Sequence, residues 1–485
     1  MNILQAKQEI KNAIKAYLMT DENGDYRIPV IAQRPILLIG PPGIGKTAIM
    51  EQIAAECHIG LVAYTMTHHT RQSAIGLPMI VSHTYGGKEY SATEYTMSEI
   101  IGSVYDYMAS TKKEQGILFL DEINCVSETL APTMLQFLQK KTFGSHKVPD
   151  GWIIVAAGNP PEYNKSVKEF DIVTLDRVRK MTITEDFSVW KSYAYERGVH
   201  PAIMTYLEIK KENFYQVETT ASGKRFVTAR GWEDLSYMIY AQELLGEAVT
   251  ETMIGQYVQH PKLARDFANY YDLYNQYKDD YHVEEIMSGK IRPETVARIR
   301  EARFDEKLSL IGLLMGRLNE DFKAQTEKNH FVEQLYEVLG SIREMPADQA
   351  LAALDAAILP LDEKADRRLI QTLYKYKGHL EAGKDFEALK AMFEKEVDVL
   401  EALTQTAGAH LEAAFDFMEE AFGESQEMVI FITELNTSRP AMTYISSNGC
   451  ERYYKYNEGL LFNSSRDKLL QDISQLRRYA DFMGI

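Results

Sequence analysis

The chain has 485 residues, of which 45% are hydrophobic and 25% are charged, as in globular proteins that build more than one apolar core. The chain has 53 lysine and arginine residues and 70 aspartate and glutamate residues. The resulting net charge of −17 disfavours nucleic acids and anionic membranes as partners. Its three cysteines lie far apart and have no CxxC spacing, so the sequence indicates neither a disulfide framework nor a zinc site, which agrees with a reducing cytoplasm.

The N-terminal segment is expected to form an amphipathic helix, because apolar residues occupy positions 3, 10, 14 and 18. Lysine and glutamate interrupt this segment, so it lacks the apolar core of a signal peptide. No apolar stretch of the chain approaches the roughly 18 residues that a membrane span needs. The sequence therefore predicts a cytoplasmic protein with no membrane span.

Five short apolar runs alternate with helical patterns over the first 185 residues. The runs are continuous rather than alternating, which is typical of strands buried on both faces of a parallel sheet covered by helices. The sequence therefore predicts an α/β core with a five-stranded parallel sheet. The predicted strands cover residues 35–40, 59–65, 116–122, 151–159 and 178–185.

Beyond the fifth run the pattern becomes helical. One interruption, residues 213–229, alternates around a Ser-Gly turn and predicts a β-hairpin. After about residue 285 apolar residues repeat at helical spacing almost throughout, which predicts an all-α region. Within it, residues 423–440 are expected to form a short compact insertion.

The segment GPPGIGKT matches the pattern G-x-x-x-x-G-K-[ST] between a predicted strand and a predicted helix. Its glycines allow backbone N–H groups to curl around an anion, and the helix directs the positive end of its dipole at the same anion. In this pattern the lysine reaches the β- and γ-phosphates and the threonine hydroxyl binds Mg²⁺. The predicted nucleotide-binding residues are Gly40, Pro41, Pro42, Gly43, Ile44, Gly45, Lys46, Thr47 and Ala48.

Asp121 and Glu122 directly follow the apolar run 117–120. Phosphoryl transfer needs acidic side chains at the tip of a strand beside the phosphate loop. Asp121 is predicted to hold Mg²⁺ together with Thr47, and Glu122 to orient and polarise the attacking water. The alternative is that the two acids cap the next helix. An Asp-Glu pair, rather than a single Asp, favours a hydrolase over a small-molecule kinase.

Asn159 ends another buried run, in the segment AAGNPPEYN. Its amide could hold the lytic water or the γ-phosphate, whereas an asparagine at the end of a strand is commonly a turn former. The order of the three features along the chain, first the phosphate loop, then the acidic pair and then the asparagine, favours the catalytic interpretation.

These motifs resemble those of the AAA+ ATPases, and most closely those of the MoxR-type branch, over about residues 1–280. GPPGIGKT corresponds to Walker A, ILFLDE to Walker B, AAGNPPEYN to sensor 1, LDRVRK to the arginine-finger segment and VTARGWEDLS to the sensor 2 segment. The resemblance implies ATP and Mg²⁺ as ligands. It also implies a P-loop AAA+ core at residues 1–185 and a helical lid at 186–284, which leaves a helical C-terminal domain of unknown role at 285–485.

In that family the subunits assemble into a ring, usually a hexamer, and each subunit places an arginine finger in its neighbour's site. Arg177 matches the finger and Arg230 matches sensor 2. Val178 stands where the family commonly has phenylalanine, and Arg179 comes next, so either Arg177 or Arg179 could be the finger. A guanidinium group suits the charge that spreads over the γ-oxygens during hydrolysis, although isolated arginines are often ordinary surface residues.

Two further predicted hairpins, at residues 76–96 and 140–152, resemble insertions that mark this branch and contact the client protein at the ring's central channel. The resemblance therefore implies a remodelling or chaperone-like ATPase that acts on a client or adaptor protein. Relatives of this type often act with proteins that carry a von Willebrand A domain. The alternatives are a nucleic-acid motor of the same clade, which the net charge disfavours, and a nucleotide-gated scaffold with little turnover.

Overall fold

The computed structural model describes residues 1–459 except 69–71, 73, 75, 128, 144–145, 164–166, 168–169, 221–222, 362–365 and 384–385. The chain divides into two compact units. The first consists of Met1–Trp190 with Phe214–Asp234, and the second of Lys191–Asn213 with the residues from Leu235 onward. The chain therefore passes between the units three times before the long helical region begins.

The first unit is built on a five-stranded sheet in which every neighbouring pair of strands is parallel. The order across the sheet is β2-β5-β8-β1-β9, so the strand that precedes the phosphate loop lies between two strands that follow later in the sequence. The predicted α/β core is confirmed. The strands are β1 (Ile36–Ile39), β2 (Gly60–Thr65), β5 (Gly116–Asp121), β8 (Trp152–Gly158) and β9 (Arg179–Thr182).

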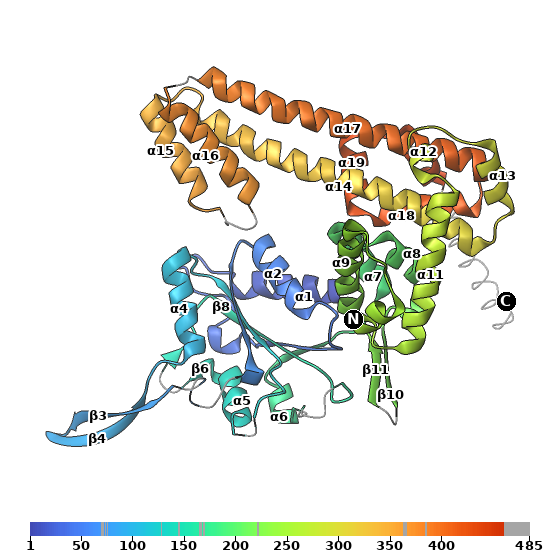
Figure 1. Cartoon of the computed structure of the whole chain (residues 1–485). Coiled ribbons are helices and arrows are strands. Elements are labelled where there is room, and N and C mark those ends of the chain that lie inside the picture. The colour runs from blue at the N-terminus through green and yellow to red at the C-terminus, as the bar shows by residue number, and fades with distance from the viewer. Residues whose placement is uncertain are drawn as a thin grey trace, which may run out of the picture. The chain divides into compact units, whose positions relative to one another are not determined.

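Helices cover both faces of this sheet (Figure 1). On one face α1 (Ile3–Tyr17) and α2 (Lys46–Glu56) pack on residues such as Leu38 and Phe119. On the other face α4 (Glu99–Thr111) and α5 (Ala131–Lys140) pack on Leu37 and Leu118, the residues that precede Leu38 and Phe119 in the same strands. Successive strand residues point to opposite faces and both faces are buried, which explains why the apolar runs are continuous.

The three predicted hairpins form as antiparallel pairs. The first turns at Gly86 and Gly87, which both have positive φ, and it extends well beyond the sheet (Figure 1). Short helical segments connect the remaining parts of this unit: η1 (Val30–Ala32), η2 (Met66–His68) and α6 (Ile172–Leu175). The hairpin strands are β3 (Pro78–Tyr85) with β4 (Lys88–Tyr95), β6 (Thr142–Phe143) with β7 (His146–Lys147), and β10 (Gln216–Thr220) with β11 (Gly223–Val227).

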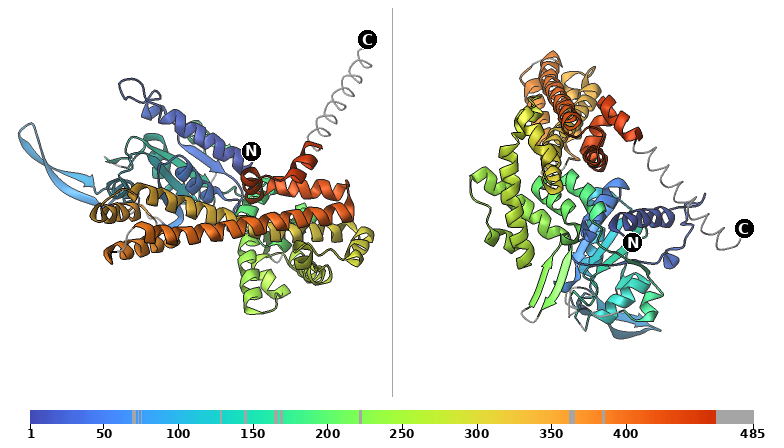
Figure 2. Two further views of the ribbon diagram at one scale, coloured as in Figure 1. Left: turned by 90° about the horizontal axis from the view of Figure 1, so that it is seen from above. Right: turned by 90° about the vertical axis from the view of Figure 1, so that its right-hand side faces the viewer.

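The second unit is helical throughout the part that the structure describes, which confirms the predicted helical C-terminal region. Two long helices, α14 and α17, run side by side, and α15 and α16 pack at one end of the pair (Figures 1 and 2). Two helices, α7 (Phe187–Arg197) and α9 (Ala229–Leu245), begin in the first unit and continue into the second. The other elements are α8 (Pro201–Ile209), η3 (Lys211–Asn213), α10 (Glu251–Tyr257), α11 (Pro261–Asp280), α12 (Val283–Met287), α13 (Pro293–Glu301), α14 (Phe304–Ile342), α15 (Ala347–Ile358), α16 (Arg367–Glu381), α17 (Phe386–Phe422), α18 (Gln426–Thr437) and α19 (Arg439–Asn448).

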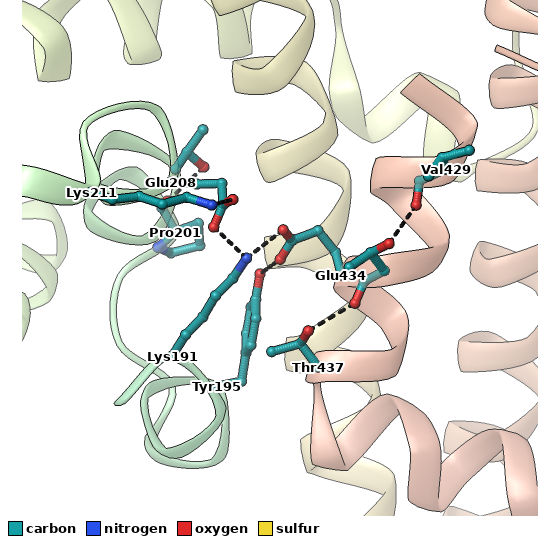
Figure 3. Close-up of polar contacts among 10 residues, drawn as sticks. Lys191, Tyr195, Pro201, Glu208, Lys211, Val429, Glu434 and Thr437 are labelled. Carbon is teal, nitrogen blue, oxygen red and sulfur yellow. Dashed lines mark hydrogen bonds and ion pairs between the residues drawn. The ribbon is translucent and has the colours of Figure 1, made fainter. Parts of the chain in front are cut away.

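A buried polar cluster joins α7, α8 and α18 inside the second unit (Figure 3). The Lys191 ammonium group forms an ion pair of 2.6 Å with Glu208 and a second ion pair with Glu434, and the Tyr195 hydroxyl donates to Glu434 at 2.5 Å. Buried charges are tolerated only when they are paired in this way. Residues 423–440, expected to be a short compact insertion, instead contribute helix α18 to the helical core, where residues such as Phe431 are buried.

Candidate functional site

The phosphate loop connects β1 to α2. Residues 40–45 form the loop, and Lys46, Thr47 and Ala48 form the first turn of α2. Gly43 and Gly45 have φ values of +74° and +90°, a backbone region in which a Cβ would be strained. Among the described residues, the amide N–H groups of residue 43 and of residues 45–48 have no hydrogen-bond acceptor, and residues 42–43 form a turn. Free donors at a helix N-terminus suit an anion such as a phosphate chain.

Lys46 lies inside this loop and is only 8% exposed. Its ammonium group donates to the carbonyl oxygens of Gly40 and Pro41, both at 2.8 Å, and to Asn159 Oδ1 at 2.9 Å. Burial lowers the pKa of Lys46 to about 8, against the opposite effect of the nearby Asp121 carboxylate. The side chain is therefore mostly charged at neutral pH and surrounded by acceptors that a phosphate oxygen can replace.

The predicted metal ligands are in direct contact, because Thr47 Oγ1 donates to Asp121 Oδ2 at 2.9 Å. Both offer oxygen atoms, which Mg²⁺ prefers, and a Mg²⁺ ion held by one or two protein groups takes its other ligands from water and phosphates. The described residues contain no group of three or more histidine, cysteine, aspartate or glutamate side chains placed to bind a metal. The oxygen atoms of Thr47 and Asp121 fit a Mg²⁺ ion that takes its other ligands from a nucleotide and water.

Glu122 follows Asp121 with a φ of +54°, and its amide donates to Asp121 Oδ1 at 2.9 Å. A residue other than glycine in this backbone region is strained, and such strain commonly occurs at active sites. The turn separates the two acids, so that Asp121 contacts Thr47 while Glu122 follows in the turn after β5. The two carboxylates therefore have different surroundings, as the predicted division of roles between a metal and a water molecule requires.

Asn159 follows β8, next to the end of β5. Besides accepting from Lys46, it accepts a 2.8 Å hydrogen bond at its carbonyl oxygen from Asn124 Nδ2. The approach of Asn124 requires Gly158, because a Cβ there would lie 2.4 Å from Asn124 Oδ1. The strand ends that carry the acidic pair and Asn159 are thus joined by a buried amide that sequence reasoning did not identify.

Residues 35–178 match the family model of the AAA domain (dynein-related subfamily). The chain carries an AAA domain. Such a domain implies ATP binding, typically with Mg²⁺, and ATPase activity, and AAA domains commonly oligomerise. No curated protein matches the chain. Among the described residues, no helix has both the length and the apolar character that crossing a membrane requires.

The two predicted arginines occupy different positions relative to the AAA domain. Arg230 lies beyond its end, in the first turn of α9, and the structure brings it to the phosphate loop: a Cβ on Gly43 would be 3.5 Å from Arg230 Cβ. Arg177 lies within the domain, just before β9, and is exposed, without an ion pair or contact with the phosphate loop among the described residues. Arg179 is instead paired with Glu9 on α1.

Two residues beyond the AAA domain contact the phosphate loop, although the sequence pattern did not single them out. The Tyr215 hydroxyl donates to the carbonyl oxygen of Pro42 at 3.1 Å. A Cβ on Gly43 would lie 3.0 Å from Thr228 Oγ1. Thr228 also accepts a 3.2 Å hydrogen bond at the same oxygen from the amide of Gly231, at the start of α9. Tyr215 lies in the predicted hairpin segment 213–229 and Thr228 in the sensor 2 segment, but nothing in either segment marked these two side chains.

Proposed function

We propose that the chain is an ATP hydrolase of the MoxR type that couples hydrolysis of Mg²⁺-bound ATP to the remodelling of a partner protein. One observation carries the hydrolase part. A row of free amide donors lies beside the contact pairs Lys46–Asn159 and Thr47–Asp121, which bring the ends of β5 and β8 to the phosphate loop. These groups can bind a triphosphate, hold its metal ion and orient a water molecule.

In this proposal the residues of the first unit have distinct roles. Lys46 binds the β- and γ-phosphates, Thr47 and Asp121 hold Mg²⁺, and Glu122 orients and polarises the attacking water. Asn159 releases Lys46 when nucleotide binds and then faces the γ-phosphate or the water. Arg230 adds positive charge from α9 within the same chain.

A ring of subunits, six in the commonest case, would supply Arg177 to the site of the neighbouring subunit. Its exposure and its lack of an ion-pair partner among the described residues support Arg177 over Arg179, whose guanidinium group is held by Glu9. Residues 186–284 would act as a lid on the nucleotide, and residues 285–485 would dock partners.

The partner in this proposal is a client or adaptor protein, for example one with a von Willebrand A domain, in the cytoplasm. Hairpin β3–β4 supports a protein partner, because it exposes apolar side chains such as those of Met79, Ile80 and Tyr85. Apolar side chains in such a position suit contact with an extended or partly unfolded polypeptide.

The test is phosphate release in magnesium buffer by the wild-type chain and by Glu122→Gln. The variant is expected to bind ATP but to hydrolyse it at least ~100-fold more slowly than wild type, because the replacement removes the group that polarises the water. Glu114→Gln, just before the opposite end of β5, is the matched control and should hydrolyse normally. Normal turnover by Glu122→Gln would contradict the proposed role. Stimulation of turnover by DNA in a salt-dependent way would favour a nucleic-acid motor instead.

A further inference from the structure

The hydroxyl group of Tyr215 holds one particular peptide unit of the phosphate loop, the one between Pro42 and Gly43, through a 3.1 Å hydrogen bond to the Pro42 carbonyl oxygen. This peptide bond is trans. In a planar trans peptide the C=O and N–H bonds point in opposite directions. The Gly43 N–H, which donates to no acceptor among the described residues, therefore points away from Tyr215.

Because residue 43 is a glycine, its own backbone preference does not fix the orientation of the Pro42–Gly43 peptide unit, so contacts with other residues must fix it. Gly43 has no Cβ, so positive and negative φ are about equally accessible to it. Two contacts restrict the choice: the hydrogen bond from Tyr215 and the side chain of Thr228, which packs directly on Gly43. Without them the unit could rotate and present a carbonyl oxygen, rather than an N–H group, to a phosphate.

Tyr215 itself is held in place by its surroundings. Phe214 beside it is 4% exposed, and its ring packs on Trp190 with 5.0 Å between ring centroids. The indole N–H of Trp232 donates to the Phe214 carbonyl oxygen at 3.2 Å. Partial burial raises the pKa of Tyr215, so its hydroxyl stays protonated and able to donate. In the hairpin β10–β11, which begins directly after Tyr215, Lys224 donates to the carbonyl oxygens of residues 162 and 163, in the segment after Asn159.

We propose that Tyr215 is a positioning residue for nucleotide binding, which acts by fixing the Gly43 N–H toward the phosphate chain. The proposal rests on the proposed function, because it needs a nucleotide in the loop. The role of Tyr215 differs from the proposed roles of Asn159 and Arg230, which concern the γ-phosphate. An amide fixed by Tyr215 binds a phosphate that ADP and ATP share, so both nucleotides depend on it equally.

The test compares wild type, Tyr215→Phe and Tyr17→Phe. Tyr17 is a matched control: its hydroxyl donates to the Arg34 carbonyl oxygen, also at 3.1 Å, in the same unit but outside the loop. Calorimetric titration with Mg²⁺-ADP and with a slowly hydrolysed ATP analogue gives the dissociation constants. Steady-state phosphate release separates KM from kcat.

Tyr215→Phe is expected to weaken the binding of both nucleotides by ~3–10-fold, which is the effect of one lost hydrogen bond. The ratio of the two dissociation constants should not change, and kcat should stay within about twofold of wild type. Tyr17→Phe should bind both nucleotides as wild type does. The thermal midpoints of the two variants should be similar, which shows that the loss is not a loss of folding.

Equal affinity of Tyr215→Phe and wild type for both nucleotides overturns the inference and leaves the proposed function in place. A loss confined to the ATP analogue also overturns it, because the contact would then be specific for the γ-phosphate. A folded wild-type chain that binds neither nucleotide overturns the proposed function and this inference with it.

Discussion

Lys46 Nζ and Asn159 Oδ1 lie 2.9 Å apart and form a hydrogen bond that links the phosphate loop to the end of β8. The bond joins residues 113 positions apart in the sequence. The Lys46 ammonium group is the only part of this link that carries a charge, and a bound phosphate would compete for it. Nucleotide binding is therefore expected to exchange the Lys46–Asn159 contact for contacts to phosphate oxygens, which frees the Asn159 amide.

The depressed pKa of Lys46 makes nucleotide affinity dependent on pH. In the free protein the ammonium group loses its proton near pH 8, whereas bound phosphate favours the protonated form and raises this pKa. Affinity for Mg²⁺-ADP should therefore fall as the pH rises above about 8, by roughly tenfold between pH 7 and pH 9. Calorimetry in buffers of different ionisation enthalpy should detect close to one proton taken up on binding at pH 9.

Lys141 provides the control for this pH dependence. Burial lowers its pKa to about 8 as well, but its ammonium group donates to the Val30 carbonyl oxygen rather than to the phosphate loop. Lys141→Met should leave the pH profile of binding unchanged, and Lys46→Met should abolish binding at every pH. Binding by wild type without proton uptake at pH 9 would show that Lys46 is not the titrating group.

Replacement of Asn159 should separate catalysis from binding. Asn159→Ala removes an amide that can reach the γ-phosphate or the water, so phosphate release should fall by at least ~10-fold, as when other polar groups that stabilise a transition state are removed. Affinity for Mg²⁺-ADP should change by less than about threefold, because Lys46 keeps its phosphate contacts. Asn23→Ala, in the exposed turn before β1, serves as the control. Equal losses for ADP binding and for turnover would mean that Asn159 mainly supports the loop.

A mixing experiment decides between the two candidate arginine fingers. Arg177→Ala should bind ATP and fail to hydrolyse it, and Lys46→Ala should fail to bind it. If the finger acts in a neighbouring subunit, mixtures of the two variants should recover measurable turnover, since some sites then combine an intact loop with an intact Arg177. Arg179→Ala should remain active, because Arg179 is occupied by Glu9. Activity of Arg177→Ala together with inactivity of Arg179→Ala would reverse the assignment.

The buried cluster of the second unit should be important for stability rather than for turnover. Lys191→Met leaves Glu434, whose side chain is 9% exposed, without its countercharge, and should lower the free energy of unfolding by ~3–5 kcal/mol. Lys211→Met removes the exposed partner of Glu208 and should lower it by less than about 1 kcal/mol. Urea unfolding followed by far-ultraviolet circular dichroism measures the difference. Equal effects of the two replacements would show that the buried ion pair contributes no more to the free energy of unfolding than the exposed one.

The sequence predicted those parts of the first unit in which local pattern and tertiary structure agree. Continuous apolar runs mark the five strands, because each strand is buried on both faces, and Gly86-Gly87 marks a turn that needs positive φ. The residues proposed for the site at 40–48, 121–122 and 159 were selected from the sequence because each group lies at or directly after the end of a strand, where parallel strands bring their ends together.

Other features could not be predicted because they depend on contacts between residues distant in the sequence. Tyr215 contacts Pro42 across 173 positions, and no local pattern distinguishes it from the other tyrosines of the chain. The role of Asn124 can be recognised only from its contact with Gly158 in the structure. Helix α18 was expected to be part of a short insertion, because its ion pair with the core, between Glu434 and Lys191, joins residues 243 positions apart.

Hairpin β3–β4 has a practical consequence for handling the protein. It is a sheet of only two strands, so each strand has an unpaired edge, and Ile80 on it is 82% exposed. Open strand edges with apolar side chains promote strand addition between molecules and aggregation. Concentrated solutions should therefore self-associate through this ribbon, and Ile80→Lys should improve solubility without altering basal phosphate release.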